Sequence, residues 1–99
     1  MVSPEHIESR IAMYQATSYS SFGEDHELTV GLSKLMSEFC NKKEGLTPAA
    51  LEDINKILVS ITITILTKED AKRFQEDASL FKPYLQQIID EVPKLMVEN

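Results

Sequence analysis

The chain has 99 residues, of which 42% are hydrophobic and 26% charged, and its formal net charge at pH 7 is -6. This length predicts a single domain, and the composition is that of a globular protein rather than a disordered one. The acidic charge disfavours direct binding to nucleic acid, because affinity for the phosphate backbone comes largely from Lys and Arg. We therefore expect another protein as the partner, one with a basic surface being electrostatically matched.

The chain carries few signals for a particular compartment. Its single cysteine, Cys40, excludes an internal disulfide and suits a reducing environment. The first residues show no basic-plus-apolar signal pattern, and the longest apolar run, residues 57–66, is too short to cross a bilayer. These features predict a cytoplasmic protein that does not enter membranes.

The first predicted element is a helix over about residues 4–18. Ser3 is a favourable N-cap, and Pro4 is tolerated at the first helical position. Its apolar stripe is narrow and consists of Ile7, Ile11 and Tyr14. In residues 15–23 the Ser and Thr side chains compete with the helix for backbone hydrogen bonds, so this segment is predicted to be an internal linker.

A second helix is predicted over residues 24–41, with acids in its first turn and lysines at its end. Its apolar face comprises Leu28, Leu32, Leu35, Met36, Phe39 and Cys40. Cys40 is therefore expected to be a buried structural thiol. Residues 41–46 are predicted to form a loop in which Gly45 adopts the left-handed conformation.

Two further helices and a last segment are predicted after this loop. Thr47 and Pro48 start a helix over residues 48–66. Its core stripe is Leu51, Ile54, Leu58, Ile61 and Ile65. A capping-box-like pattern then restarts the chain as a helix over residues 68–81, and a segment over residues 83–92 follows Pro83. We expect Pro93 to end or bend that segment and residues 96–99 to fray.

The run ILVSITITIL at residues 57–66 fits two conformations. Its alternation of Ile with Ser or Thr is typical of a half-buried strand. However, the chain offers no second strand, so a strand here would have to pair with another molecule. The upstream stripe also continues in helical register through the run. The sequence favours a helix, with a strand paired across a dimer as the alternative.

If the run is helical, it has more apolar surface than one stripe. Val59, Ile63 and Leu66 form a second arc about 120° from the core stripe. Two interpretations remain open. Either other helices surround this one and bury both arcs, or the second arc is a surface for self-association or for a partner.

The polar residues do not form a recognisable catalytic or metal site. Glu24 and Asp25 belong to an acidic cluster around His26, but consecutive helical positions point about 100° apart and do not converge on one ion. We expect no metal, no cofactor and no enzymatic activity. The exposed acids, including Glu69 and Asp70, are instead candidates for contact with a basic protein.

Together these patterns predict an all-α protein, a small bundle of four to five helices, with a homodimer also considered. The expected function is that of an interaction module, a regulator or inhibitor that acts by binding another protein. The predicted partner-binding residues are Val59, Ile63, Leu66, Glu24, Asp25, Glu69 and Asp70. Alternatives are a self-associating structural module and a dimeric regulator linked to nucleic acid.

Overall fold

The computed structural model describes residues 2–97, with residues 68–71 described by their backbone alone. Within this range the chain forms α-helices and short 3-10 helices (η) and contains no strand, which confirms the all-α prediction. The elements in chain order are α1 (Pro4–Phe22), α2 (Glu27–Lys42), η1 (Lys43–Gly45), α3 (Pro48–Leu66), α4 (Lys68–Glu76), η2 (Ala78–Phe81) and α5 (Lys82–Leu95).

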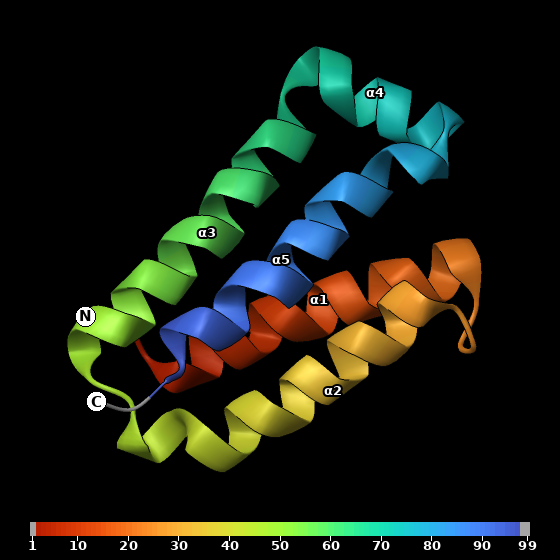
Figure 1. The fold of residues 1–99 in the computed structure, drawn as a ribbon. Coiled ribbons are helices and arrows are strands. Elements are labelled where there is room, and N and C mark those ends of the chain that lie inside the picture. The colour runs from red at the N-terminus through yellow and green to blue at the C-terminus, as the bar shows by residue number, and fades with distance from the viewer. Residues whose placement is uncertain (1, 98–99) are drawn as a thin grey trace.

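The four long helices form a closed ring in which each packs on two neighbours. Helices α1 and α2 form an antiparallel hairpin, α5 packs on α2 and α3, and α3 completes the ring by packing on α1. The short helix α4 joins the end of α3 to η2 and α5 (Figure 1). The molecule measures 41 × 29 × 19 Å, and its thinnest dimension matches two layers of helices.

The core lies between the four long helices and uses the stripes read from the sequence. Fully buried side chains come from each of them: Ile7, Ile11, Leu32, Phe39, Ile54, Leu58, Leu85 and Ile88. Two predicted caps also start their helices. Ser3 Oγ accepts a hydrogen bond from the His6 amide at 3.4 Å, and Thr47 Oγ1 accepts one from the Ala50 amide at 3.1 Å.

The predicted linker over residues 15–23 is wrong, because α1 continues to Phe22. The polar side chains of this segment bond within or between helices instead of competing with the backbone. Gln15 Nε2 donates to Ser33 Oγ on α2 at 2.8 Å. Ser18 Oγ and Thr29 Oγ1 form a buried hydrogen bond of 2.7 Å between α1 and α2. Packing on α2 therefore extends a helix that local propensity alone would end.

The turn between α1 and α2 also differs from the prediction. Helix α2 begins at Glu27 rather than at residue 24, and its N-cap is His26, whose Nδ1 accepts the Leu28 amide at 3.1 Å. Gly23 has the positive φ of 94° that favours glycine, whereas Gly45, expected to be left-handed, lies in η1 without one.

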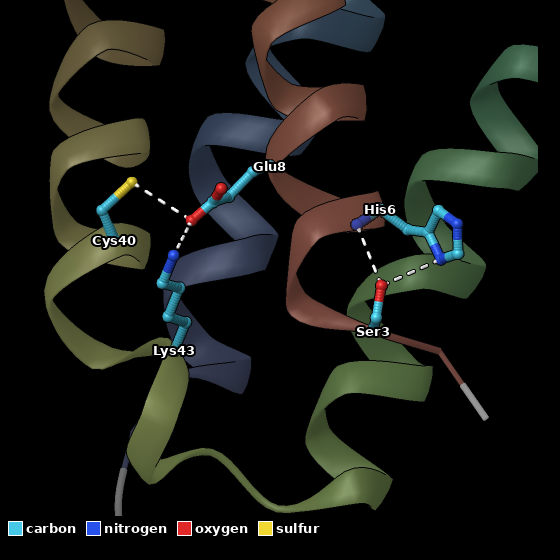
Figure 2. A network of polar contacts seen from close by, with 5 residues as sticks. All are labelled: Ser3, His6, Glu8, Cys40 and Lys43. Atoms are coloured by element: carbon cyan, nitrogen blue, oxygen red, sulfur yellow. Dashed lines mark hydrogen bonds and ion pairs between the residues drawn. The ribbon is translucent and has the colours of Figure 1, made fainter.

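The prediction of a buried Cys40 is wrong as well, because this side chain is exposed at the N-terminal end of α1. Figure 2 shows the Cys40 thiol and the Lys43 ammonium group converging on the Glu8 carboxylate. The sulfur lies 3.6 Å from Glu8 Oε1. Partial desolvation of the thiol and the nearby Glu8 carboxylate raise the pKa of Cys40, while the hydrogen bond from Lys43 lowers the pKa of Glu8. The ion pair between Glu8 and Lys43 connects α1 to η1.

The C-terminal third is divided differently from the prediction. The helix expected over residues 68–81 ends at Glu76, and η2 follows. Asp77 interrupts it by accepting hydrogen bonds from the Ser79 amide and hydroxyl. Stacking of the Phe74 and Phe81 rings, 4.8 Å apart, closes the resulting turn.

Helix α5 starts at Lys82 and extends through Pro93 to Leu95, so Pro93 does not end the segment predicted over residues 83–92. The prediction that residues 96–99 fray is also partly wrong. Met96 is fully buried in the core, and Val97 is exposed. The last two positions of that predicted tail, 98 and 99, lie outside the described residues. Packing of Met96 offsets the backbone hydrogen bond that a proline inside a helix cannot make.

Residues 57–66 are helical and form the second half of α3, so the alternative strand is not formed. The Thr residues that suggested a strand bond back along the helix. Thr62 Oγ1 donates to the Leu58 carbonyl and Thr64 Oγ1 to the Ser60 carbonyl, each at 2.9 Å. These bonds satisfy the hydroxyl groups within the helix. Burial of the core stripe then outweighs the β propensity of the run.

Candidate interaction surface

Helix α3 occupies a corner of the ring, and this position leaves one side of it open. Its core stripe packs on α1 and α5, with Leu58 fully buried and Ile61 3% exposed. The second arc predicted from the sequence, which we call the outer arc, consists of Val59, Ile63 and Leu66. Ile63 is 61% exposed and Leu66 68% exposed, while Val59 is partly buried. The interpretation in which surrounding helices bury both arcs is therefore wrong.

The outer arc lies on a stretch of sequence without charge, although Lys56 lines a hollow with Val59 and Ile63. Residues 57–67 contain no charged side chain, and neither do residues 11–23, although 26% of the chain is charged. These are the two longest uncharged stretches of the sequence. Helix α1 contributes the first and α3 the second, and the two helices pack directly on each other. Folding thus brings parts of the two stretches together, residues 13–17 of α1 and residues 62–66 of α3.

A small pocket lies where α1, α3 and η2 meet, and we call it the apolar pocket. Its volume is about 170 Å³, and Met13, Tyr14, Thr17, Thr62, Ile65, Leu66 and Phe81 line it. Leu66 therefore belongs both to the outer arc and to this pocket. Met13, across the groove on α1, is 47% exposed.

Hydrogen bonds hold α1 and α3 together beside the pocket. Tyr14 Oη donates to the Leu58 carbonyl at 3.1 Å and also contacts the Thr62 hydroxyl. Burial raises the pKa of the Tyr14 phenol above its usual range. Thr17 Oγ1 donates to the Met13 carbonyl at 2.9 Å. The pocket is thus built on rigid helices whose polar groups are already bonded.

Two further hollows adjoin the outer arc. Ile63 and Val59 line a shallow one with Asn55 and Lys56 on the opposite flank of α3. Leu66 lines another with Ser21, Phe74 and Phe81 at the end of the bundle. The outer arc is therefore a ridge with concave surface on both sides, a shape that suits contact with another molecule.

The structure describes the side chains of only two of the four acidic residues predicted to bind a partner. Glu24 and Asp25 are exposed in the turn that follows α1 rather than in the first turn of a helix. This turn comes three residues after Ser21, which lines the same hollow as Leu66. Glu69 and Asp70 follow Leu66 along the chain, but their side chains lie outside the described residues.

Residues 2–67 and 72–97 contain no group of three or more His, Cys, Asp or Glu side chains that could hold a metal ion. No helix of the described part is long and apolar enough to cross a membrane.

Sequence reasoning found the outer arc but missed the α1 side of the face. Met13 falls in the helix predicted over residues 4–18, Thr17 in the predicted linker, and Phe81 at the end of the helix predicted over residues 68–81. The absence of charge from residues 11–23, matched by that of residues 57–67, was the signal that could have paired the two segments. Searches against family models, curated proteins and solved structures give no match for this chain.

Proposed function

We propose that this chain is a protein-interaction module, a regulator or inhibitor that acts by binding another protein through the outer arc of α3. The observation that carries the proposal is the exposure of Ile63 and Leu66, at 61% and 68%, on the uncharged second half of α3. Isolated exposed apolar residues are common on proteins, but a contiguous apolar surface beside concave hollows is typical of interaction sites.

The energetics of such a contact are favourable. Complete burial of an Ile or Leu side chain contributes about 1.5–3 kcal/mol, and more than half of that remains available at Ile63 and Leu66. Both residues lie on a helix anchored in the core by Leu58 and Ile61. Because the helix is already ordered, binding does not incur the cost of folding a flexible segment.

The net charge of -6 supports a partner with a basic surface. An acidic protein attracts such a partner over a distance of about a Debye length and so accelerates association. The uncharged face would then form the contact itself, without desolvating charged groups at its centre. Charge would therefore govern the rate of encounter, and the apolar arc the stability of the complex.

Affinity capture from extracts of the producing cell tests this function. The wild-type chain is compared with Ile63→Asp and with Tyr19→Asp, an α1 residue that is 58% exposed and lies about 120° around the helix from Met13. We expect a protein that wild type and Tyr19→Asp retain and that Ile63→Asp loses. Equal capture by all three chains would contradict the assignment of the outer arc.

Self-association is a second candidate, favoured by the same absence of charge. Two copies that meet through this face would keep their acidic surfaces apart, which other faces of a chain with charge -6 do less well. Sedimentation analysis distinguishes the two functions. A dimer that Ile63→Asp converts to a folded monomer would support a self-associating module.

A further inference from the structure

The apolar pocket is chemically restricted in what it can bind. Its polar lining groups are the hydroxyls of Tyr14, Thr17 and Thr62, and each already bonds to a backbone carbonyl of its own or the neighbouring helix. The other lining side chains are apolar. Because these hydroxyl hydrogens are already donated, a ligand acceptor would lose its hydrogen bonds to water there without replacement. The pocket therefore favours an uncharged, apolar group.

The size of the pocket further restricts which ligand groups can bind in it. Its volume of about 170 Å³ is close to that of an engineered protein cavity of about 150 Å³ that takes up benzene. One aromatic or branched aliphatic side chain fills such a space. Interfaces concentrate their binding energy in anchors of this kind, large side chains that insert into a pocket of the partner.

The shape of the surrounding surface indicates how that side chain would be presented. Val59, Ile63 and Leu66 recur at intervals of four and three residues and form a straight ridge about 10 Å long. A second helix laid along the ridge presents apolar side chains at the same intervals, so one of them can enter the pocket beside Leu66. An extended peptide, whose alternate side chains point to opposite sides, matches these intervals less well.

Charge indicates the rest of the partner's composition. In the segments near the pocket, the described residues of 21–27 and 72–82 comprise five acidic and three basic ones, so this end of the chain is net acidic. Asp77 is exposed beside Ala78, which lines the adjoining hollow with Leu66. A helix with basic residues on its polar face is electrostatically matched to this surrounding.

A second copy of the chain fits this surface less well. The uncharged parts of α1 and α3 extend about 15–18 Å along the helices and about 20 Å across them. Two copies meeting there would bury about 700 Å² in total, less than the roughly 1,000 Å² expected of a specific interface.

We infer that the partner binds as a basic amphipathic helix whose bulky apolar side chain, an aromatic one fitting best, occupies the pocket between Met13, Leu66 and Phe81. This inference rests on the proposed function and specifies its partner. It places the recognition helix along the outer arc and its anchor between α1 and α3. The partner's cationic residues then face the acidic segments at this end of the bundle.

Synthetic helices provide the test, and the protein is well suited to it because it contains no tryptophan. The probes are peptides of about 15 residues with Leu on one face and Lys on the other, in a set that moves a single Trp through the apolar positions. We expect one register to bind with a blue shift of Trp emission. Replacing that Trp by Ala should weaken binding at least tenfold, and replacing Lys by Glu should abolish it.

Two protein variants locate the binding site. Met13→Asp, which places a carboxylate at the rim of the pocket, should weaken binding of the best peptide at least tenfold. Tyr19→Asp introduces the same charge on the same helix away from the pocket, and binding should stay within twofold. Circular dichroism shows whether both variants keep the helical content of the wild type, and Leu66→Asp provides a second pocket variant if Met13→Asp unfolds.

The outcomes distinguish this inference from the proposed function. If no register binds, or if Met13→Asp and Leu66→Asp bind as well as Tyr19→Asp, the helical anchor is overturned. Capture that still depends on Ile63 would then leave the proposed function standing with another type of ligand. Saturation of the pocket by a second copy, seen as a dimer that the peptide cannot dissociate, would also overturn the inference.

Discussion

Alanine substitution of two neighbouring isoleucines gives a direct measure of how α3 is oriented. In a strand, Ile61 and Ile63 would share one face and would contribute similarly to stability. In α3 they lie on different sides, with Ile61 3% exposed and Ile63 61% exposed. The structure therefore predicts a large difference in the free energy of unfolding between Ile61→Ala and Ile63→Ala.

The magnitudes follow from the buried surface. Ile61→Ala removes about three buried carbon groups at about 0.8 kcal/mol each and leaves a cavity, which gives a loss of about 3–4 kcal/mol. At Ile63 only about two fifths of the side chain is buried, so the same change removes about 1 kcal/mol of burial. The higher helix propensity of Ala returns about 0.4 kcal/mol, which leaves a loss of about 0.5 kcal/mol.

Urea unfolding followed by circular dichroism at 222 nm measures both values on the same day and in the same buffer. Protein concentration should be varied, because any association through Ile63 would add a concentration-dependent contribution to stability. Losses for the two variants that agree within 1 kcal/mol would refute the orientation of α3, and with it the outer arc. A loss at Ile63 larger than at Ile61 would do so more strongly.

Three further predictions concern other parts of the chain. Tyr14→Phe removes the hydrogen bond to the Leu58 carbonyl and should lower the free energy of unfolding in urea by about 1–2 kcal/mol. Because folding raises the pKa of the Tyr14 phenol, wild-type stability should be retained below the ordinary pKa of tyrosine. It should then fall as the pH rises through the pKa of Tyr14 in the folded protein. Cys40 should react with iodoacetamide more slowly than a free thiol at pH 8, since its pKa is raised, and Glu8→Gln should accelerate the reaction by removing a nearby negative charge; unchanged rates would contradict that contact. Gly23→Ala should lower the stability measured by thermal unfolding by about 1–3 kcal/mol, because φ is 94°. Nothing lies within 4 Å of the added methyl group, so the loss would come from the backbone conformation alone, and a neutral effect would argue against that conformation.

The helix starts and core stripes could be predicted because they depend on local chemistry. A Ser or Thr followed by Pro provides an N-cap and a first-turn residue, and both Ser3 and Thr47 use them. Apolar residues at intervals of three and four identify a buried face without knowledge of the neighbouring helix. The outer arc was predictable for the same reason, as surplus apolar surface on α3.

The features that could not be predicted depend on tertiary partners. Residues 15–22 are helical because Gln15 and Ser18 bond to α2, and nothing in the local sequence identifies Ser33 or Thr29 as their partners. Cys40 shares a helix face with Phe39 in the periodic pattern, yet it lies at the rim of that face beside Glu8. The period fixes the centre of a stripe better than its edges.

The apolar pocket shows the same limit for function. Its lining comes from residues 13–17, 62–66 and 81, and the sequence places these segments far apart. Only the ring order of the helices brings α1 beside α3. The uncharged character of the two stretches is visible in the sequence, but their adjacency is a property of the fold.

The central claim is that the outer arc of α3 binds another protein, and the dissociation constant of the captured complex tests it most directly. Isothermal titration of the captured protein with wild type, Ile63→Asp and Tyr19→Asp gives the three values under one condition. Losing the burial of Ile63, which is 61% exposed in the free chain, and placing a carboxylate there should weaken binding at least tenfold. Tyr19→Asp should bind within twofold of wild type. Equal affinities for wild type and Ile63→Asp would contradict the claim.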